Sequence, residues 1–148
     1  MDKQQVRSHL QALLEERITA IRADIASTLA ARNSDTKSSA GDKHEVGRAM
    51  VQQELDQLEA QLAKLQASLQ ELARVPLDHL FDRVAFGSLV TTNAGLYFIA
   101  IGLGRITFRG APYSVISLAS PIGQALQHKR VGDVVVFNGT PMTVQAIE

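Results

Sequence analysis

Two apolar stripes with helical spacing occupy the first half of the chain. The more regular one follows alternating steps of three and four residues, at Leu55, Leu58, Leu62, Leu65, Leu69 and Leu72. This is the a/d spacing of a coiled coil, in which a narrow apolar seam packs against a matching seam on another helix. The other stripe precedes it, at Val6, Leu10, Leu14, Ile18, Ile21, Ile25 and Leu29. The spacing therefore predicts two long helices whose seams face each other.

A polar segment at 33–48, which contains two glycines, separates the two stripes. A turn there would fold the helices back on each other as an antiparallel hairpin over residues 1–75. With about 30 residues in each helix, the hairpin would be roughly 45 Å long at 1.5 Å per residue. Because narrow seams leave little other apolar surface, we expect this coiled coil to project into solvent. An intermolecular coiled coil, as in a purely structural adaptor, has the same spacing, but the matched lengths of the stripes favour the hairpin.

The second half of the chain has the composition of a small sheet domain. All four prolines and eight of the ten glycines lie from Pro76 onward. After a linker at 76–85, short apolar runs separated by turn residues predict strands at 89–92, 96–101, 105–108, 113–118, 134–137 and 142–147. Ser120 as an N-cap with Pro121 in the first helical position predicts a short helix, and Asn138-Gly139 predicts a tight hairpin. The fold class is α+β, with a helical hairpin followed by a small, largely antiparallel sheet carrying one short helix.

Composition excludes several classes of protein. The chain has no cysteine, so a disulfide scaffold and thiolate metal sites are excluded. Its 15 basic and 15 acidic residues balance, which argues against binding nucleic acid through bulk charge. The first residues carry charges throughout and no apolar run has the length of a membrane span, so we expect a cytoplasmic protein.

Three carboxylates stand out in the polar segment between the helices, namely Asp35, Asp42 and Glu45. Asp42 and Glu45 are three residues apart and would share one face of a helix that begins near Asp42. A structural explanation is available, because acidic side chains complement the N-terminus of a helix. Alternatively, the hairpin carries hard oxygen ligands to a distant reaction centre. Two or three carboxylates alone bind Mg²⁺ weakly, so this tip would complete a site supplied by a partner.

The chain resembles the Gre transcript-cleavage factors of bacterial RNA polymerase. The segments FGSLVTT (86–92) and SPIGQALQHKRVGDVVVF (120–137) are similar to parts of the Gre C-terminal domain, and the resemblance implies an FKBP-like fold for residues 86–148. Gre tips have the form Asp-x-x-Glu-Asn-Ala-Glu-Tyr. Aligned without gaps, Asp42 and Glu45 match its two glutamates, whereas Ser39 takes the place of the leading aspartate and Val46 that of the tyrosine.

The resemblance implies a monomer that inserts its coiled-coil tip into the secondary channel of the polymerase and contacts nucleic acid only through the elongation complex. There Asp42 and Glu45, with Asp35 as a third carboxylate, would help to hold a shared Mg²⁺ and to position a water for hydrolysis of backtracked RNA. The chain would stimulate the polymerase's cleavage and catalyse nothing alone. We expect its partner contacts at Lys43 and Arg48, and at the segment Ser120, Pro121 and Ile122.

Two other functions remain open from the sequence. A protein that occupies the same channel without stimulating cleavage would regulate or inhibit the polymerase, and loss of the carboxylate at Ser39 would favour that role by lowering ion occupancy. An FKBP-like peptidyl-prolyl isomerase would need a deep aromatic pocket. The few aromatic rings of the second half are instead expected to fill its core: Tyr97, Phe98, Phe108, Tyr113 and Phe137.

Overall fold

The computed structural model describes residues 1–35 and 41–148, with side chains for all of these except 34, 35 and 41–44. Two long helices come first, α1 (Lys3–Asp35) and α2 (Gly41–Ala73). Six strands and a short helix follow, in the order β1 (Leu89–Thr92), β2 (Gly95–Ile99), β3 (Gly104–Phe108), β4 (Ala111–Ile116), α3 (Pro121–Leu126), β5 (Val134–Phe137) and β6 (Thr140–Ile147). The predicted α+β class is confirmed.

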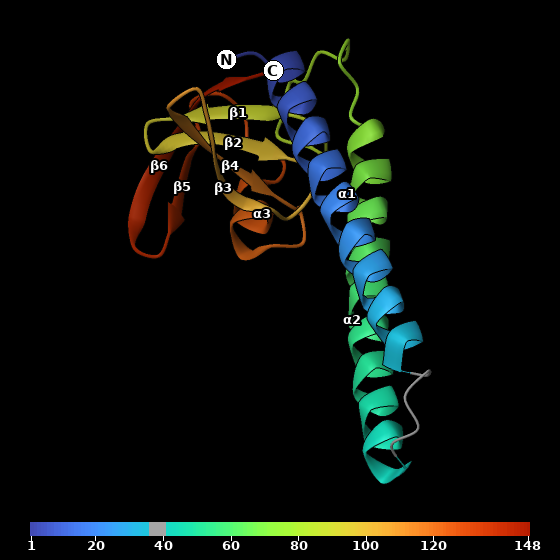
Figure 1. Cartoon of the computed structure of the whole chain (residues 1–148). Helices are drawn as coiled ribbons and strands as arrows, with labels where there is room; N and C mark the ends of the chain where they lie inside the picture. The colour runs from blue at the N-terminus through green and yellow to red at the C-terminus, as the bar shows by residue number, and fades with distance from the viewer. Residues whose placement is uncertain (36–40) are drawn as a thin grey trace. The chain divides into compact units, whose positions relative to one another are not determined.

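The chain forms two compact units. The helical unit consists of Ala12–Leu69, and the sheet unit combines Met1–Gln11 with Gln70–Glu148. In the helical unit α1 and α2 run side by side in opposite directions (Figure 1), which confirms the predicted hairpin. Leu14, Ile18 and Leu55 are buried, and the other seam residues of this unit are half-buried. The seams thus pack together, as their spacing predicts.

The interhelical turn is shorter than predicted. Residues 33–48 are polar and suggest a loop, but residues 33–35 belong to α1 and residues 41–48 to α2. A helix end that faces solvent needs no apolar residue, so polarity alone does not mark a loop. Gly47 lies within α2, at a position where an added Cβ would meet no atom within 4 Å. The prediction that the second helix begins near Asp42 is confirmed.

The sheet has the strand order β3-β4-β2-β1-β6-β5. All neighbouring strands are antiparallel except β2 and β4, which pair in parallel with Tyr97 opposite Ser114. The predicted, largely antiparallel sheet is therefore confirmed, and it contains one parallel pair. The β3–β4 hairpin folds back so that β4, and not β3, lies beside β2, and the turn residues that bound each strand do not specify this choice.

Two tight turns connect the hairpins. Asn138 and Gly139 join β5 to β6 with φ of 50° and 76°, and Arg109 and Gly110 join β3 to β4 with φ of 50° and 79°. Positive φ at both central residues matches the right-handed twist of the paired strands. The hairpin predicted at Asn138-Gly139 is confirmed.

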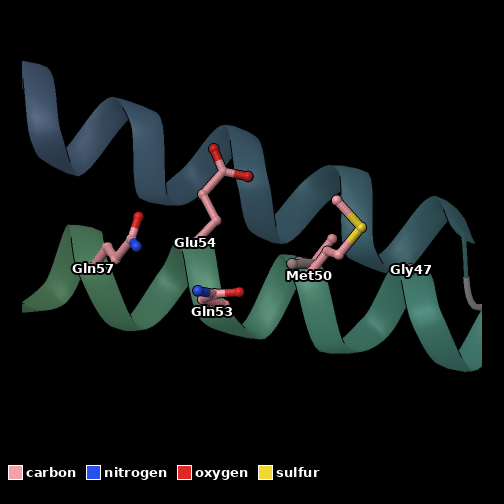
Figure 2. Close-up of a pocket in the computed structure, with 6 residues that line it drawn as sticks. Gly47, Met50, Gln53, Glu54 and Gln57 are labelled. Carbon is pink, nitrogen blue, oxygen red and sulfur yellow. The ribbon is translucent and has the colours of Figure 1, made fainter.

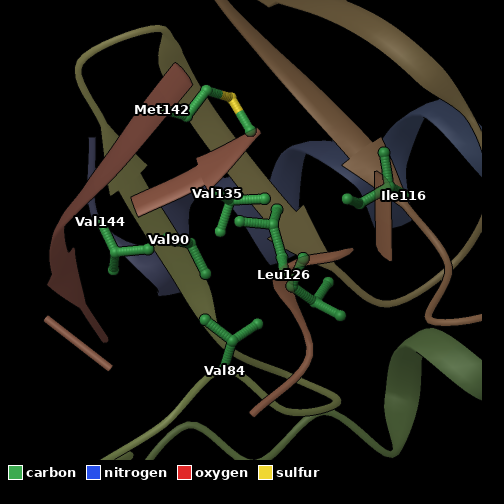
Figure 3. Packing of buried hydrophobic residues seen from close by; sticks show 8 residues of the cluster. Val84, Val90, Ile116, Leu126, Val135, Met142 and Val144 are labelled. Atoms are coloured by element: carbon green, nitrogen blue, oxygen red, sulfur yellow. The ribbon is translucent and has the colours of Figure 1, made fainter. Parts of the chain in front are cut away.

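One face of the sheet packs under α3. Its core, shown in Figure 3, contains aliphatic residues from β1, β2, β4, β5, β6, α3 and the linker: Val84, Val90, Ile99, Ile116, Leu126, Val135, Met142 and Val144. The other face contacts the first turns of α1, where His9 Nδ1 lies 2.7 Å from the Tyr113 hydroxyl and the His9 ring lies 4.4 Å from that of Phe108. Each face of the sheet is therefore covered in part within this unit.

Candidate functional site

The structure places the predicted tip residues at the two helix ends. Asp35 is the last residue of α1, and Asp42 and Lys43 are the second and third residues of α2. The structure describes the backbone of Asp35, Asp42 and Lys43 but not their side chains, and Ser39 is not among the described residues. Glu45 is exposed on the first turns of α2 and has no ion pair with a described residue. Since α2 carries both Asp42 and Glu45 three positions apart, these two residues share one face of the helix.

The side chains that the structure describes do not form a metal site by themselves. No three His, Asp or Glu side chains among them lie close enough together to hold an ion. Glu45 is the tip carboxylate whose side chain the structure describes, and it could supply one oxygen ligand. Mg²⁺ retains most of its waters and takes further ligands from carboxylates or phosphates. A single exposed carboxylate therefore fits such an ion only together with ligands from elsewhere.

A polar hollow of about 550 Å³ lies between the two helices near this end of the hairpin. Arg32 and Asn33 of α1 and Arg48 of α2 line it, together with Ala49 and Gln52. The predicted partner residue Arg48 thus lines the same hollow as a second arginine, Arg32. Sequence reasoning missed Arg32. The available signal was its place in the last turn of α1, because a cation there complements the helix dipole.

An apolar surface on α2 was also missed. Val46 and Met50 are 61% and 66% exposed. Met50 lines an open hollow of about 580 Å³ with Gly47, Val51 and the polar residues Gln53, Glu54 and Gln57 (Figure 2). Val46 and Met50 are four residues apart and fall outside the leucine seam, whose register continues back from Leu55 to Val51. Because Val46 and Met50 do not follow the spacing of the seam, the sequence could have identified them as surface residues.

The segment Ser120, Pro121 and Ile122 forms the start of α3. The Ser120 hydroxyl donates to the Ser117 carbonyl over 2.7 Å and accepts from the Gly123 N–H over 3.0 Å, which confirms the predicted N-cap of α3. Ile122 is half-buried against the core, whereas Pro121 is exposed. Of the three predicted partner contacts here, Pro121 offers the most accessible surface.

Aromatic side chains of the sheet unit are largely used in packing. Phe98 and Tyr113 are 0% and 2% exposed. Tyr97, Tyr113 and Arg105 line a hollow of only about 130 Å³, whereas sites for small molecules usually enclose about 300–1,000 Å³. Burial raises the pKa of the Tyr113 hydroxyl to about 12. This geometry does not favour the isomerase alternative.

An unpartnered ammonium is buried at the start of α1. Lys3 is buried with its Nζ 4.5 Å from the centre of the Phe81 ring, and among the described residues this nitrogen has no hydrogen-bond partner. Burial lowers the pKa of Lys3, and the charge of Glu148 opposes this shift. The backbone N–H of Lys3 also donates to Glu148 Oε1 over 3.4 Å. Lys3 thus connects the chain's first helical turn to the linker and the C-terminal residue.

Comparisons with known proteins add the following findings. No family model matches the chain, and no curated protein matches it. No helix in the described part of the chain has the length and apolar character needed to cross a membrane. Among solved structures, the chain is similar to one described as the transcription factor Gfh1, with 20% identity and a TM-score of 0.37. The similarity covers 93% of this chain and 92% of that one.

Proposed function

We propose that this chain is a transcription elongation factor of the Gre type, which binds bacterial RNA polymerase and aids Mg²⁺-dependent cleavage of backtracked RNA. The observation that supports it best is the antiparallel hairpin of two 33-residue helices, which joins a sheet unit and carries Asp42 and Glu45 on the first turns of α2. The parts of the helices within the helical unit, 12–35 of α1 and 41–69 of α2, are roughly 35–45 Å long at 1.5 Å per residue, which suits a channel that a globular body cannot enter.

The tip residues would act as ligands that complete the polymerase's own site. Glu45 is exposed, and its carboxylate can approach an ion held by another protein. Asp42 on the same face would add a second oxygen ligand, with Asp35 at the end of α1 as a third carboxylate. When bound there, a second Mg²⁺ lowers the pKa of a coordinated water and neutralises charge that develops on the phosphate. The chain itself contributes position and negative charge.

A cleavage assay on a stalled, backtracked elongation complex tests this proposal. We expect Glu45→Gln and Asp42→Asn each to slow stimulated RNA cleavage at least about tenfold, because a lost ligand lowers ion occupancy. Both variants should still compete with wild type for the polymerase. Glu59→Gln is the matched control, since Glu59 is an exposed glutamate farther along α2. If both tip variants cleave and inhibit as wild type does, the proposal is wrong.

A channel-binding regulator without cleavage activity is the second candidate. It is favoured by Val46, which is 61% exposed at the position where the Gre tip has a tyrosine, and by Ser39 at the position of the leading aspartate. This candidate predicts that the wild-type chain slows elongation at every Mg²⁺ concentration and never increases cleavage. Stimulated cleavage by the wild-type chain would contradict it.

A further inference from the structure

Strand β5 forms one end of the six-stranded sheet. Its inner neighbour is β6, and no strand follows on its outer side in the part of the chain that the structure describes (Figure 1). The β5–β6 pairing is regular, with Val135 opposite Met142 and Phe137 opposite Thr140. The outer side of β5 is therefore an unpaired edge.

The backbone groups of two residues point toward this open edge. The N–H of Val144 donates to the carbonyl of Asp133 over 2.9 Å, so the carbonyl of Asp133 faces β6, while its N–H donates to the Arg130 carbonyl. Backbone direction alternates along an antiparallel strand, so Val135 and Phe137 also face β6. The N–H and C=O of Val134 and Val136 consequently point away from it.

The side chains along this edge are apolar and exposed. Val134 and Val136 are 58% and 66% exposed on the face of the sheet opposite the buried Val135. Edge strands are normally protected by lysine, proline or a bulge. Along β5 there is none of these, and no charged residue occurs from Val134 to Ile147. This edge lacks the usual protection against pairing with another strand.

We propose that β5 pairs with β5 of a second copy of this chain, antiparallel and centred on Val135. In this register Val134 lies opposite Val136 of the second copy, and the twofold axis repeats the pair. These are the residues whose backbone groups point outward, so each pair can exchange two hydrogen bonds. Their valine side chains then become cross-strand neighbours on one face, which is a favourable pairing for β-branched residues.

The chemistry of the edge favours a second copy as the occupant. An acidic or basic partner strand would find no opposite charge along β5, whereas an uncharged, valine-rich strand complements itself. The chain has a formal net charge of zero, so repulsion between copies is small. The pairing leaves the leucine seam inside each hairpin and thus differs from a coiled-coil dimer. It does not rest on the proposed role in transcription, and it departs from the monomer that the resemblance to the Gre factors implies.

Amide hydrogen exchange over a concentration series tests this proposal with an internal control. The strand has four residues, so we expect weak association, measured on the intact chain from about 10 μM to about 1 mM. The amides of Val134 and Val136 should gain protection at least about tenfold across this range, in parallel with a monomer–dimer transition in sedimentation. The amide of Val135, which bonds to β6, should keep the same protection throughout.

A pair of lysine substitutions locates the interface. Val136→Lys places a charge on the exposed edge and should abolish both the dimer and the gain in protection. Val46→Lys is the matched control, because Val46 is equally exposed but lies on α2, and it should dimerise as wild type does. A chain that sediments as a monomer up to about 1 mM, or a dimer that survives Val136→Lys, would refute the proposal. The proposal would also be refuted if the amides of Val134 and Val136 gained protection only when a different protein was added.

Discussion

Gly123→Ala is the substitution for which the structure and helix propensity make opposite predictions. Within an ordinary helix, replacing glycine by alanine stabilises by about 0.5–1 kcal/mol. At Gly123, however, an added Cβ would lie 2.0 Å from the Ser117 carbonyl oxygen and 2.9 Å from Ser120 Oγ. Real Cβ atoms essentially never approach within 3.0 Å, so a backbone atom would have to move by about 1 Å.

That movement would disturb two other interactions. The Ser117 carbonyl accepts the Ser120 hydroxyl at 2.7 Å, so displacing it disrupts the N-cap of α3. Shifting α3 instead would withdraw Leu126, which is fully buried in the core. Overpacking costs about 1–3 kcal/mol and a lost N-cap about 1 kcal/mol. We therefore expect Gly123→Ala to destabilise the sheet unit by about 3 kcal/mol.

Urea denaturation followed by tyrosine fluorescence measures this effect, because both tyrosines, Tyr97 and Tyr113, belong to the sheet unit. For a unit of this size, such a loss corresponds to a fall in melting temperature of roughly 12–24 °C. Ser120→Ala should cost only about 1 kcal/mol. Gln124→Ala, at an exposed position of the same helix, should change stability by less than about 0.5 kcal/mol. The reasoning is wrong if Gly123→Ala is as stable as wild type or more stable.

Three further substitutions test other features of the two units. Lys3→Met should stabilise the sheet unit by about 1 kcal/mol in urea denaturation, because it removes a buried nitrogen without a hydrogen-bond partner; a clear loss would show that the contact with Phe81 is favourable. Tyr113→Phe should cost about 1 kcal/mol at neutral pH through the lost contact with His9. Burial raises the pKa of Tyr113 to about 12, above the value of about 10 in an unfolded chain. Between these two pKa values the folded state keeps the Tyr113 proton, whereas the unfolded state loses it. The free energy of unfolding of the wild type should therefore fall as pH rises above about 10. The urea midpoint of Tyr113→Phe should fall less over the same pH range, because this variant lacks the hydroxyl. Leu55→Ala should cost the helical unit about 2–4 kcal/mol by far-UV circular dichroism, since it opens a cavity in the seam.

The elements with strong local signals are those that sequence patterns predict best. β1 and β5 have the predicted bounds, Leu89–Thr92 and Val134–Phe137. The N-cap at Ser120 and the turn at Asn138-Gly139 also form as predicted. Each of these depends on residues within a few positions of one another, because capping and tight turns are satisfied by nearby backbone groups.

The candidate site is predictable only in part. Sequence spacing correctly places Asp42 and Glu45 on one helix. It overestimates the length of the turn, because an exposed helix end and a loop have the same polar composition. The hollow between Arg32 and Arg48 depends on how the two helices align against each other, and a heptad pattern admits more than one such alignment.

The amino-acid sequence by itself determines the two long helices, the narrow seam that joins them and the approximate positions of the strands, since helical and strand periodicity are properties of short windows. Only the tertiary structure decides that β4 inserts beside β2, that the start of α1 covers one face of the sheet through His9, and that β5 keeps an open edge. These outcomes depend on which distant segments bury each other's surface, and the free energy of that choice is shared among residues far apart in the chain.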